Sequence, residues 1–545
     1  MKYVICCLAM VLLCGAGFAQ EHSHAEKTRP VVLVAGLGNT HHPVSTKNAE
    51  AQKFFDQGLA LIYDFNHDEA ARSFARAAEL DPKLAMAYWG VAEAVGPNYN
   101  DPADDGRFKQ AHEAIEKAGV LSGDASANER DYIAALAKRF PAPGADLRKA
   151  AEEYRDAMRE VMKKYPDDLD AATLFAESAM NLHPWGLWHI DGTPEVGTDE
   201  IVATLESVIQ RDPNHIGAVH YYIHAVEASP NPERALAAAQ RLAALAPSAG
   251  HIVHMPAHIY IRTGDYAAAV STNEKAATAD QAYIKANGGD NMYSIMYYSH
   301  NLDFIAVSAA MDGDYTDAHK AAAMLADNVR PHVKDMPPVE GFLAIPIAVD
   351  IRFHKWAEIL ALPEPDKSNT TTTAFWHYAR GMALAATGKV NEAQSEYQIV
   401  EATEKSTAAE TRFPTSVGNK TKDILRMEEH TLAAKIAEAK KDNNEAIAEL
   451  RRAVALQDTL LYNEPPDWFF PVRESLGAML LMNGDTMEAE RAFREDLQRN
   501  LRNPRSLFGL AETLKKEMKD YDAGFVEKEF QGSWKGGAVK IEDLV

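Results

Sequence analysis

Apolar residues recur every three or four positions along most of the chain, with polar and charged residues between them. The stretch AQKFFDQGLALIYDFNHDEAARSFARAAELDPKL (51–84) carries this spacing through two segments, which a polar turn around DFNHD joins. A period near 3.6 residues places the apolar side chains on one face of a helix. No stretch shows the strict alternation that is typical of strands. We therefore predict an all-α protein built from amphipathic helices.

The same stretch predicts how two helices pack together. Gly58, Ala70 and Ala77 are small residues that allow close helix contact, Phe74 is large enough to fill the space between units, and Pro82 ends the second helix. These five positions resemble the signature of the tetratricopeptide repeat (TPR) family, a 34-residue helix pair. The resemblance implies a right-handed α-α superhelical solenoid of TPR-like helix pairs. It also implies a concave groove that takes a protein or peptide ligand.

Similar units recur along the chain. Residues 216–247 and 250–280 follow the same frame, and a GDY turn appears at 264–266 and again at 313–315. Related turn motifs near residues 387, 440 and 483 extend the pattern. We expect about seven or eight helix pairs between residues 51 and 519.

The predicted organisation follows from where this pattern starts, weakens and ends. We assign a signal peptide (1–19), a loosely ordered N-terminus (20–48), N-terminal and central repeats (49–330), an irregular connecting segment (331–375), C-terminal repeats (376–519) and a tail (520–545). An insert at 183–197 breaks the period and holds Trp185 and Trp188. It is either a lid over the groove or a structural loop that its two tryptophans anchor.

The first residues indicate export. One lysine, an apolar run and small residues ending at Ala19 are typical of a secretory signal, so we expect a periplasmic or secreted protein. No later stretch is long and apolar enough for a transmembrane segment. Leu13 before Cys14 disfavours a lipid anchor. In this processed form the N-terminal QEHSH would place His22 third, an arrangement that can bind copper.

Composition narrows the chemistry. All three cysteines lie within the predicted signal, so disulfides, thiolate metal sites and cysteine nucleophiles are excluded from the processed chain. The formal net charge of -23 argues against nucleic acid as a partner. No nucleophile elbow, phosphate-binding loop or dinucleotide fingerprint is present.

Four histidines repeat in phase. In the TPR frame His220 and His224 take positions 5 and 9 of one unit, and His254 and His258 take the same positions of the next unit, 34 residues later. The resemblance implies that these positions line the concave groove and contribute little to packing. Residues four apart share a helix face. Two His-x-x-x-His pairs on neighbouring helices would therefore bring four imidazoles together, which is a geometry for chelating a cation.

Three further residues fall near this place in the same frame. His251 and His300 take position 2 of their units, and Glu177 takes position 9 of an earlier unit. We expect one of them to complete a ligand shell, with Glu177 or Asp303 orienting an imidazole. By contrast, His377 and His430 fall at packing position 4, and His215 falls at a helix start.

Pro256 complicates this frame because it lies between His254 and His258. A proline inside a helix removes a hydrogen bond and clashes with the preceding turn. Either the helix kinks at Pro256, or it begins near Met255 with Pro256 in its first turn. The second case would place His251 and His254 in a loop.

We interpret the chain as an exported TPR-repeat binding protein whose central groove holds a metal ion. Nitrogen ligands without sulfur suit zinc, copper, nickel or iron. One alternative is a metal-free scaffold in which the histidines contact a peptide. The other is a metal-dependent enzyme, hydrolytic or oxidative, in which an open coordination position activates water or oxygen. More than four ligands would allow two metals and would favour the enzyme.

Overall fold

The computed structural model describes residues 29–142, 144–288 and 291–545. The predicted signal peptide and His22 lie outside these residues. The described chain is all-α, and its only strand-like features are two isolated bridges, Trp188 with Pro194 and Arg412 with Lys420. The all-α prediction is confirmed. Within this part of the chain, no helix combines the length and apolarity needed to cross a membrane.

The helices of the N-terminal half are α2 (Ala49–Tyr63), α3 (His67–Leu80), α4 (Ala85–Val95), α5 (Asp105–Leu121), α6 (Ala127–Arg139), α7 (Leu147–Lys164), α8 (Leu169–Met180), α9 (Thr198–Arg211), α10 (Ile216–Val226), α11 (Leu236–Leu245), α12 (Gly250–His254) and α13 (Pro256–Arg262).

Those of the C-terminal half are α14 (Tyr266–Asn287), α15 (Tyr298–Asp312), α16 (Tyr315–Val329), α17 (Ile345–Arg352), α18 (Trp356–Ala361), α19 (Thr370–Ala386), α20 (Val390–Ser406), α21 (Thr421–Ala439), α22 (Asn443–Gln457), α23 (Val472–Asn483), α24 (Thr486–Arg499), α25 (Pro504–Lys516) and α26 (Asp520–Ser533). Short helices of other types include η3 (Tyr293–Tyr297), a π-helix, and η4 (Pro337–Ala344), a 3₁₀-helix.

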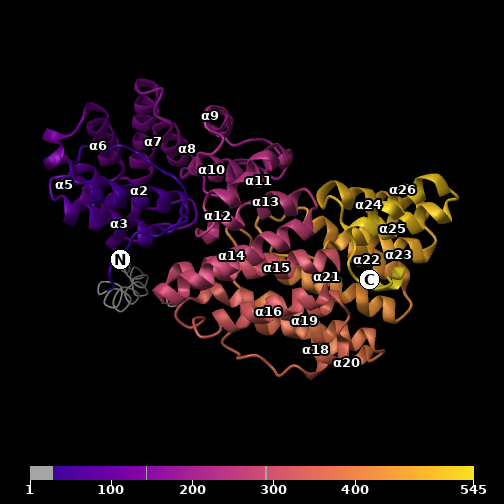
Figure 1. Cartoon of the computed structure of the whole chain (residues 1–545). Helices are drawn as coiled ribbons and strands as arrows, with labels where there is room; N and C mark the ends of the chain where they lie inside the picture. The colour runs from indigo at the N-terminus through magenta and orange to yellow at the C-terminus, as the bar shows by residue number, and fades with distance from the viewer. Residues whose placement is uncertain (1–28, 143, 289–290) are drawn as a thin grey trace, which may run out of the picture.

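Consecutive helices pack as pairs, from α2 with α3 to α25 with α26, and each pair packs on the next. The pairs follow one another from the N-terminal helices at the left of Figure 1 to α23–α26 at the right. This is the TPR-like α-α solenoid that the sequence predicts. The described chain contains more pairs than the seven or eight expected, because α4–α9 and α17–α18 also form pairs with weaker sequence signals.

A phenylalanine between two glycines shows why the repeat signature gives this packing. A Cβ atom on Gly58 or on Gly90 would lie 2.7 or 2.3 Å from the ring of Phe74, so the ring fits between two helices only because both residues lack a side chain. Phe493 lies between Gly477 and Gly509 in the same way, with distances of 2.7 and 2.2 Å. The same contact at both ends of the chain identifies one repeated packing unit.

Three segments are more regular than the sequence indicates. Residues 29–48 contain no helix but are held in place, for example through Val34 N–H to Gln57 and His42 to Asp170. The connecting segment 331–375 contains α17 and α18. The segment set apart as a tail contains α26, which packs on α25.

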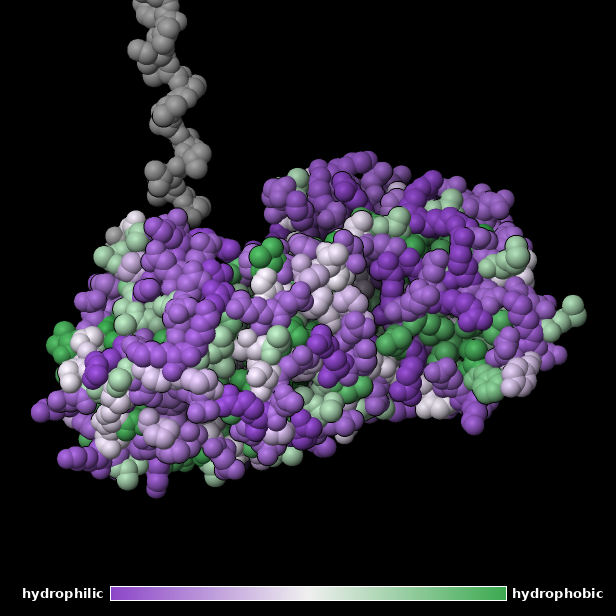
Figure 2. Space-filling view, turned by 90° about the horizontal axis from the view of Figure 1, so that it is seen from above, coloured by the Kyte–Doolittle hydropathy of each residue, from purple (hydrophilic) through white to green (hydrophobic). Residues whose placement is uncertain are grey.

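Two hydrophobic cores meet in the middle of the molecule. The N-terminal core runs from Ala51 to Ile259, and the C-terminal core runs from Val270 to Leu544. A small third cluster consists of Ala257, Ala269 and Phe304. In Figure 2 hydrophilic residues cover most of the visible face, and hydrophobic side chains gather in a hollow on the side of the C-terminal helices.

The backbone at Pro256 combines both alternatives. Helix α12 ends at His254, Met255 keeps helical dihedral angles (φ -50°, ψ -35°), and α13 starts with Pro256 in its first turn. His251 and His254 therefore lie on a helix rather than in a loop. The break occurs where proline lacks a donor for the preceding turn.

Candidate metal centre

Six histidines converge where the two cores meet. They come from neighbouring helices: His220 and His224 from α10, His251 and His254 from α12, His258 from α13, and His300 from α15. Neighbouring rings have centroids 4.7 to 6.2 Å apart. The structure thus brings together all six histidines that the sequence analysis selects. They form two groups of three, each with possible ligand atoms within 4.8 Å of one another.

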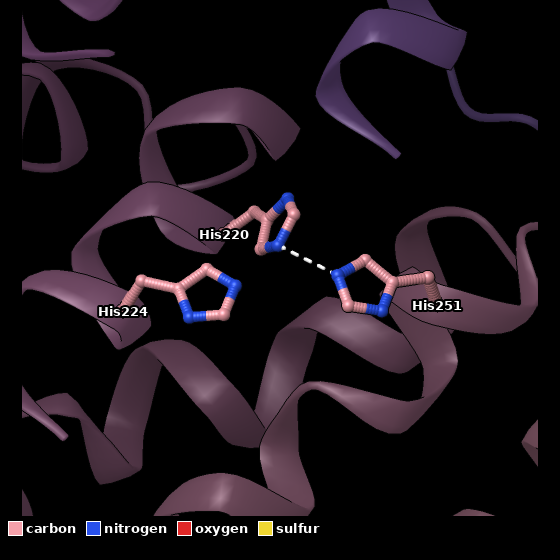
Figure 3. A group of neighbouring side chains, drawn as sticks. All are labelled: His220, His224 and His251. Atoms are coloured by element: carbon pink, nitrogen blue, oxygen red, sulfur yellow. Dashed lines mark hydrogen bonds between the residues drawn. The ribbon is translucent and has the colours of Figure 1, made fainter. Parts of the chain in front are cut away.

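The first triad is His220, His224 and His251, shown in Figure 3. The Nε2 atoms of His220 and His251 lie 3.1 Å apart. Two nitrogens bound to one tetrahedral metal at about 2.0–2.1 Å would be separated by about 3.3 Å. Figure 3 shows the rings approaching one another from α10 and α12. Their spacing suits a shared cation.

Hydrogen bonds set the tautomers of two of these rings. His220 Nδ1 donates to the carbonyl oxygen of Tyr63 (2.6 Å), and His224 Nδ1 donates to Glu227 Oε1 (2.9 Å). An imidazole that donates from Nδ1 carries its lone pair on Nε2. His224 Nε2 is buried and has no hydrogen-bond partner among the described residues. These acceptors act as the outer-shell groups that orient metal-binding histidines elsewhere.

The second triad is His254, His258 and His300. His254 Nδ1 donates to Asn273 Oδ1 (2.6 Å), while the Asn273 amide nitrogen donates to the Ala269 carbonyl (2.8 Å) and so fixes which amide atom is the acceptor. The Nε2 atoms of His254 and His258 lie 2.7 Å apart. The lone pair of His254 therefore points at His258.

Two buried carboxylates join the second triad to the first. Glu227, three residues after His224, lies 2.5 Å from His258 Nδ1, and Glu464 in the loop after α22 lies 2.7 Å from the same atom. His224, Glu227 and His258 form a third group with ligand spacing. Glu227 thus lies between the two triads and is placed to contact groups in both.

Charge is distributed unevenly over the cluster. Burial, followed by the neighbouring imidazoles, lowers the pKa of His220, His251 and His254 well below the usual value. Burial also lowers the pKa of His300 to about 3. His258 differs: burial opposes its charge, but Glu227 and Glu464 raise its pKa to about 10. Burial lowers the pKa of His224 as well, so five neutral imidazoles surround one that is protonated at neutral pH.

Burial contradicts one part of the sequence prediction. His220, His224, His251, His254 and His258 are each at most 2% exposed, and only His300 is partly buried. Instead of lining an open groove they are packed inside the molecule, against Phe65 and Phe304. The expectation that they contribute little to packing is wrong, because the turn between α2 and α3 with Phe65, helix α15 and the loop at Glu464 cover that face.

Glu177 belongs to a different group. It lies 4.0 Å from Arg139, it accepts a hydrogen bond from Asn181, and Glu93 contacts the same arginine at 3.2 Å. A buried guanidinium requires carboxylates nearby, and this requirement explains the position of Glu177. The structure does not group Glu177 with the histidines.

The sequence prediction missed two carboxylates of the cluster, Glu227 and Glu464. Glu227 has a recognisable sequence signal, because residues i and i+3 share a helix face and Glu227 follows His224 by three. Nothing in the sequence links Glu464 to His258.

A cavity of about 680 Å³ borders the cluster. His224, His251, His258 and His300 form part of its wall, together with Asp303 and Glu464. Much of the remaining wall is apolar and comes from the C-terminal half. Its size is within the range of small-molecule sites.

The insert 183–197 packs against this region through its tryptophans. Trp188 Nε1 donates to the Ala225 carbonyl (2.8 Å), and the Trp185 ring contacts His224 edge-on with centroids 5.8 Å apart. His189 and Asp191 instead contact Glu195 and Thr193 within the insert. The insert is therefore anchored by both tryptophans, and its own polar groups do not join the cluster.

A fourth group with ligand spacing is His42, Asp168 and Asp170. Asp170 contacts His42 (2.8 Å) and His215 (3.2 Å) and accepts a hydrogen bond from Tyr63 (2.5 Å), and these contacts hold its pKa well below the usual range despite burial. Its polar atoms are satisfied by protein groups. We interpret this group as the attachment of the N-terminal segment.

Comparison with known proteins adds little to this description. No family model and no curated protein sequence matches the chain. Among solved structures, the human IFIT1 dimer with m7Gppp-AAAA covers 90% of this chain and 91% of its own at 14% identity and a TM-score of 0.32. The match to yeast Tom70 covers 89% of this chain and 93% of Tom70, with 11% identity and a TM-score of 0.28. The match to the P58(IPK) TPR domain covers 87% of this chain and 100% of that domain, with 15% identity and a TM-score of 0.22. At these scores the likeness supports no conclusion about function, and the TPR-like fold rests on the helix pairs and the Phe74 and Phe493 contacts.

Proposed function

We propose that the chain is a metal-binding helical-repeat protein that holds two transition-metal ions at the junction of its two cores. The first triad would bind one ion and the second triad the other, with Glu227 between them. The observation that carries this proposal is that acceptors hold the Nδ1 atoms of His220, His224 and His254. The Nε2 atom of His220 faces that of His251, the Nε2 atom of His254 faces that of His258, and the buried Nε2 atom of His224 has no partner among the described residues. Such rings are preorganised for a cation.

The donor set suits zinc, copper, nickel or iron. Each triad supplies three nitrogen ligands, and no described sulfur group is part of either. Three protein ligands leave a coordination position open, as in catalytic rather than structural zinc sites. The cavity on one side of the cluster favours a second candidate function, a metal-dependent hydrolytic or oxidative enzyme.

The other inferences from the sequence stand as proposals. A peptide in the concave groove would not reach the five fully buried histidines, so a partner protein would bind elsewhere on the helix pairs. Export rests on residues 1–19 alone.

Elemental mass spectrometry of the full chain, purified without a histidine tag and incubated with zinc or copper, tests the metal proposal. We expect two metal ions per chain, about one in His251→Ala and about one in His300→Ala. His430→Ala is the matched control, because His430 pairs with Glu449 (2.7 Å) in the C-terminal repeats, and it should retain two. Wild-type protein that binds no metal under these conditions would overturn the proposal.

A further inference from the structure

The cavity beside the histidines is built from segments far apart in the sequence. Its wall includes residues of η3 and α15, η4 and α17, the start of α19, the loop around Phe413 and the loop 463–470. Only the folded chain brings these segments around one space. The cavity therefore belongs to the tertiary structure as a whole, with the metal centre at one end of its wall.

Aromatic side chains form a large share of the apolar part of this wall. They include Tyr297, Phe342, Phe375, Phe413, Trp468 and Phe469. Rings of this size give a ligand a large apolar contact area and fix its orientation through stacking or edge contacts. A molecule that fills the cavity must have a largely apolar body.

Several polar groups of the wall have no hydrogen-bond partner among the described residues, including His224 Nε2 and Trp468 Nε1, and Asp303 is the one that follows His300 on α15. Asp303 is 6% exposed, and its Oδ1 atom accepts no hydrogen bond from the described residues. It lies one turn after His300 on α15, so the two side chains share a helix face. An unpaired buried acceptor is costly, and a donor on a bound ligand would satisfy it.

Charge selects the class of ligand. Four carboxyl groups, Glu340, Asp303, Glu464 and Asp467, line the cavity; burial raises the pKa of each, that of Asp303 to about 8, and none of them offers an anion a positive partner. Arg412, the only lysine or arginine in its described wall, is exposed. Metal ions in the triads would in turn disfavour a cation, a step that rests on the proposed function.

We propose that this cavity binds a neutral small molecule with an aromatic or aliphatic body and a hydroxyl group at one end. The hydroxyl donates to Asp303 beside His300, and the body lies against the aromatic wall. The hydroxyl oxygen is thereby held next to the second triad.

Isothermal titration calorimetry of the full chain with four naphthalene derivatives tests this proposal. The probes are 2-naphthol, 2-methoxynaphthalene, 2-naphthoate and protonated 2-naphthylmethylamine, each added to metal-free and to zinc-loaded protein. For zinc-loaded protein we expect 2-naphthol to bind at least tenfold more tightly than either charged probe. Asp303→Ala should weaken 2-naphthol binding about tenfold, the effect of losing one buried hydrogen bond, and leave 2-methoxynaphthalene unchanged.

The outcomes separate this inference from the metal proposal. Asp303→Asn keeps an acceptor and should keep most of the 2-naphthol affinity, so it serves as the conservative variant. In metal-free protein 2-naphthol should still bind, while the amine should gain affinity because no metal repels it.

Metal binding without naphthol binding would overturn the cavity proposal alone. Naphthol binding by protein that takes up no metal would support the cavity and overturn the metal proposal. Equal losses for 2-naphthol and its methyl ether would overturn the role of Asp303.

Discussion

The two histidine triads have similar aromatic packing but different charges. In each, one phenylalanine contacts all three imidazoles, Phe65 in the first triad and Phe304 in the second, with ring centroids 4.5 to 5.7 Å apart. The first triad is neutral, and a backbone carbonyl helps to orient it. The second contains the protonated His258, which two carboxylates hold.

This difference teaches that equivalent repeat positions need not give equivalent chemistry. His224 and His258 occupy the same position in adjacent repeats, yet burial lowers the pKa of His224 while Glu227 and Glu464 raise that of His258 to about 10. The groups packed around each helix decide its charge, and those groups differ along the solenoid. We expect the triads to respond differently to pH and to substitution.

The largest effect should come from Glu227, which both triads share. Replacing Glu227 with Ala removes the partner of His224 and of protonated His258, so we expect loss of both metal ions and a decrease of about 3–5 kcal/mol in the free energy of unfolding. Urea unfolding of metal-free protein and elemental analysis measure the two effects.

Glu152→Ala, which removes an exposed partner of Arg148, is the control and should change stability by no more than about 0.5 kcal/mol. Glu227→Gln retains the shape if the alanine variant does not fold, and normal metal content in it would contradict a shared role.

The second-largest effect should be a difference in the pH dependence of metal affinity, because only the second triad releases a proton when it binds metal. The pKa of His258 near 10 means that metal binding at the second triad displaces a proton between pH 6.5 and 8.5, so its affinity should increase about tenfold per pH unit. The first triad is already neutral there, since burial lowers the pKa of its rings, and its affinity should stay nearly constant. Zinc titrations of His251→Ala, which retains the second triad, and of His300→Ala, which retains the first, measure each slope. Identical slopes would show that the asymmetry does not exist.

A substitution behind the second triad should have a smaller and selective effect. Asn273→Ala removes the acceptor that orients His254, and we expect the metal affinity of the second site to decrease about 10–100-fold. The first site should not change, because its orienting groups are Tyr63 and Glu227. Competition titrations with a chelator resolve the two sites, and an equal decrease at both would indicate a general loosening of the fold.

The smallest effect should come from the insert, which packs on the helix of the first triad. Trp188→Phe removes one hydrogen bond to Ala225 and should lower stability by about 1 kcal/mol, with metal content unchanged. Thermal unfolding measures the change. Loss of metal in this variant would mean that the insert positions the first triad rather than only covering it.

Much of the fold was predictable from local signals. Phe74 and its glycine neighbours, and the 3.6-residue period, predict paired helices, and the structure has them. The six histidines were also predictable as a group, because the 34-residue spacing brings His224 near His258 on adjacent helices, although His220 contacts His251 rather than His254. The same reasoning placed Glu177 beside the histidines incorrectly, because the repeat frame takes no account of Arg139, which is buried on another helix and contacts Glu177.

Sequence alone determined what repeats: which residues form helices, how consecutive helices pair, and that histidines recur at matching positions. These features depend on side chains a few residues apart or one repeat apart, where helix geometry sets the distance. Only the tertiary structure decided that the histidines are buried, that they form two triads rather than one, and that Glu464 reaches His258 from a loop beyond α22. Contacts between the two halves of a solenoid depend on how the whole superhelix curves. No local pattern encodes that curvature, and for this reason the cavity and the charge of the second triad could not be predicted.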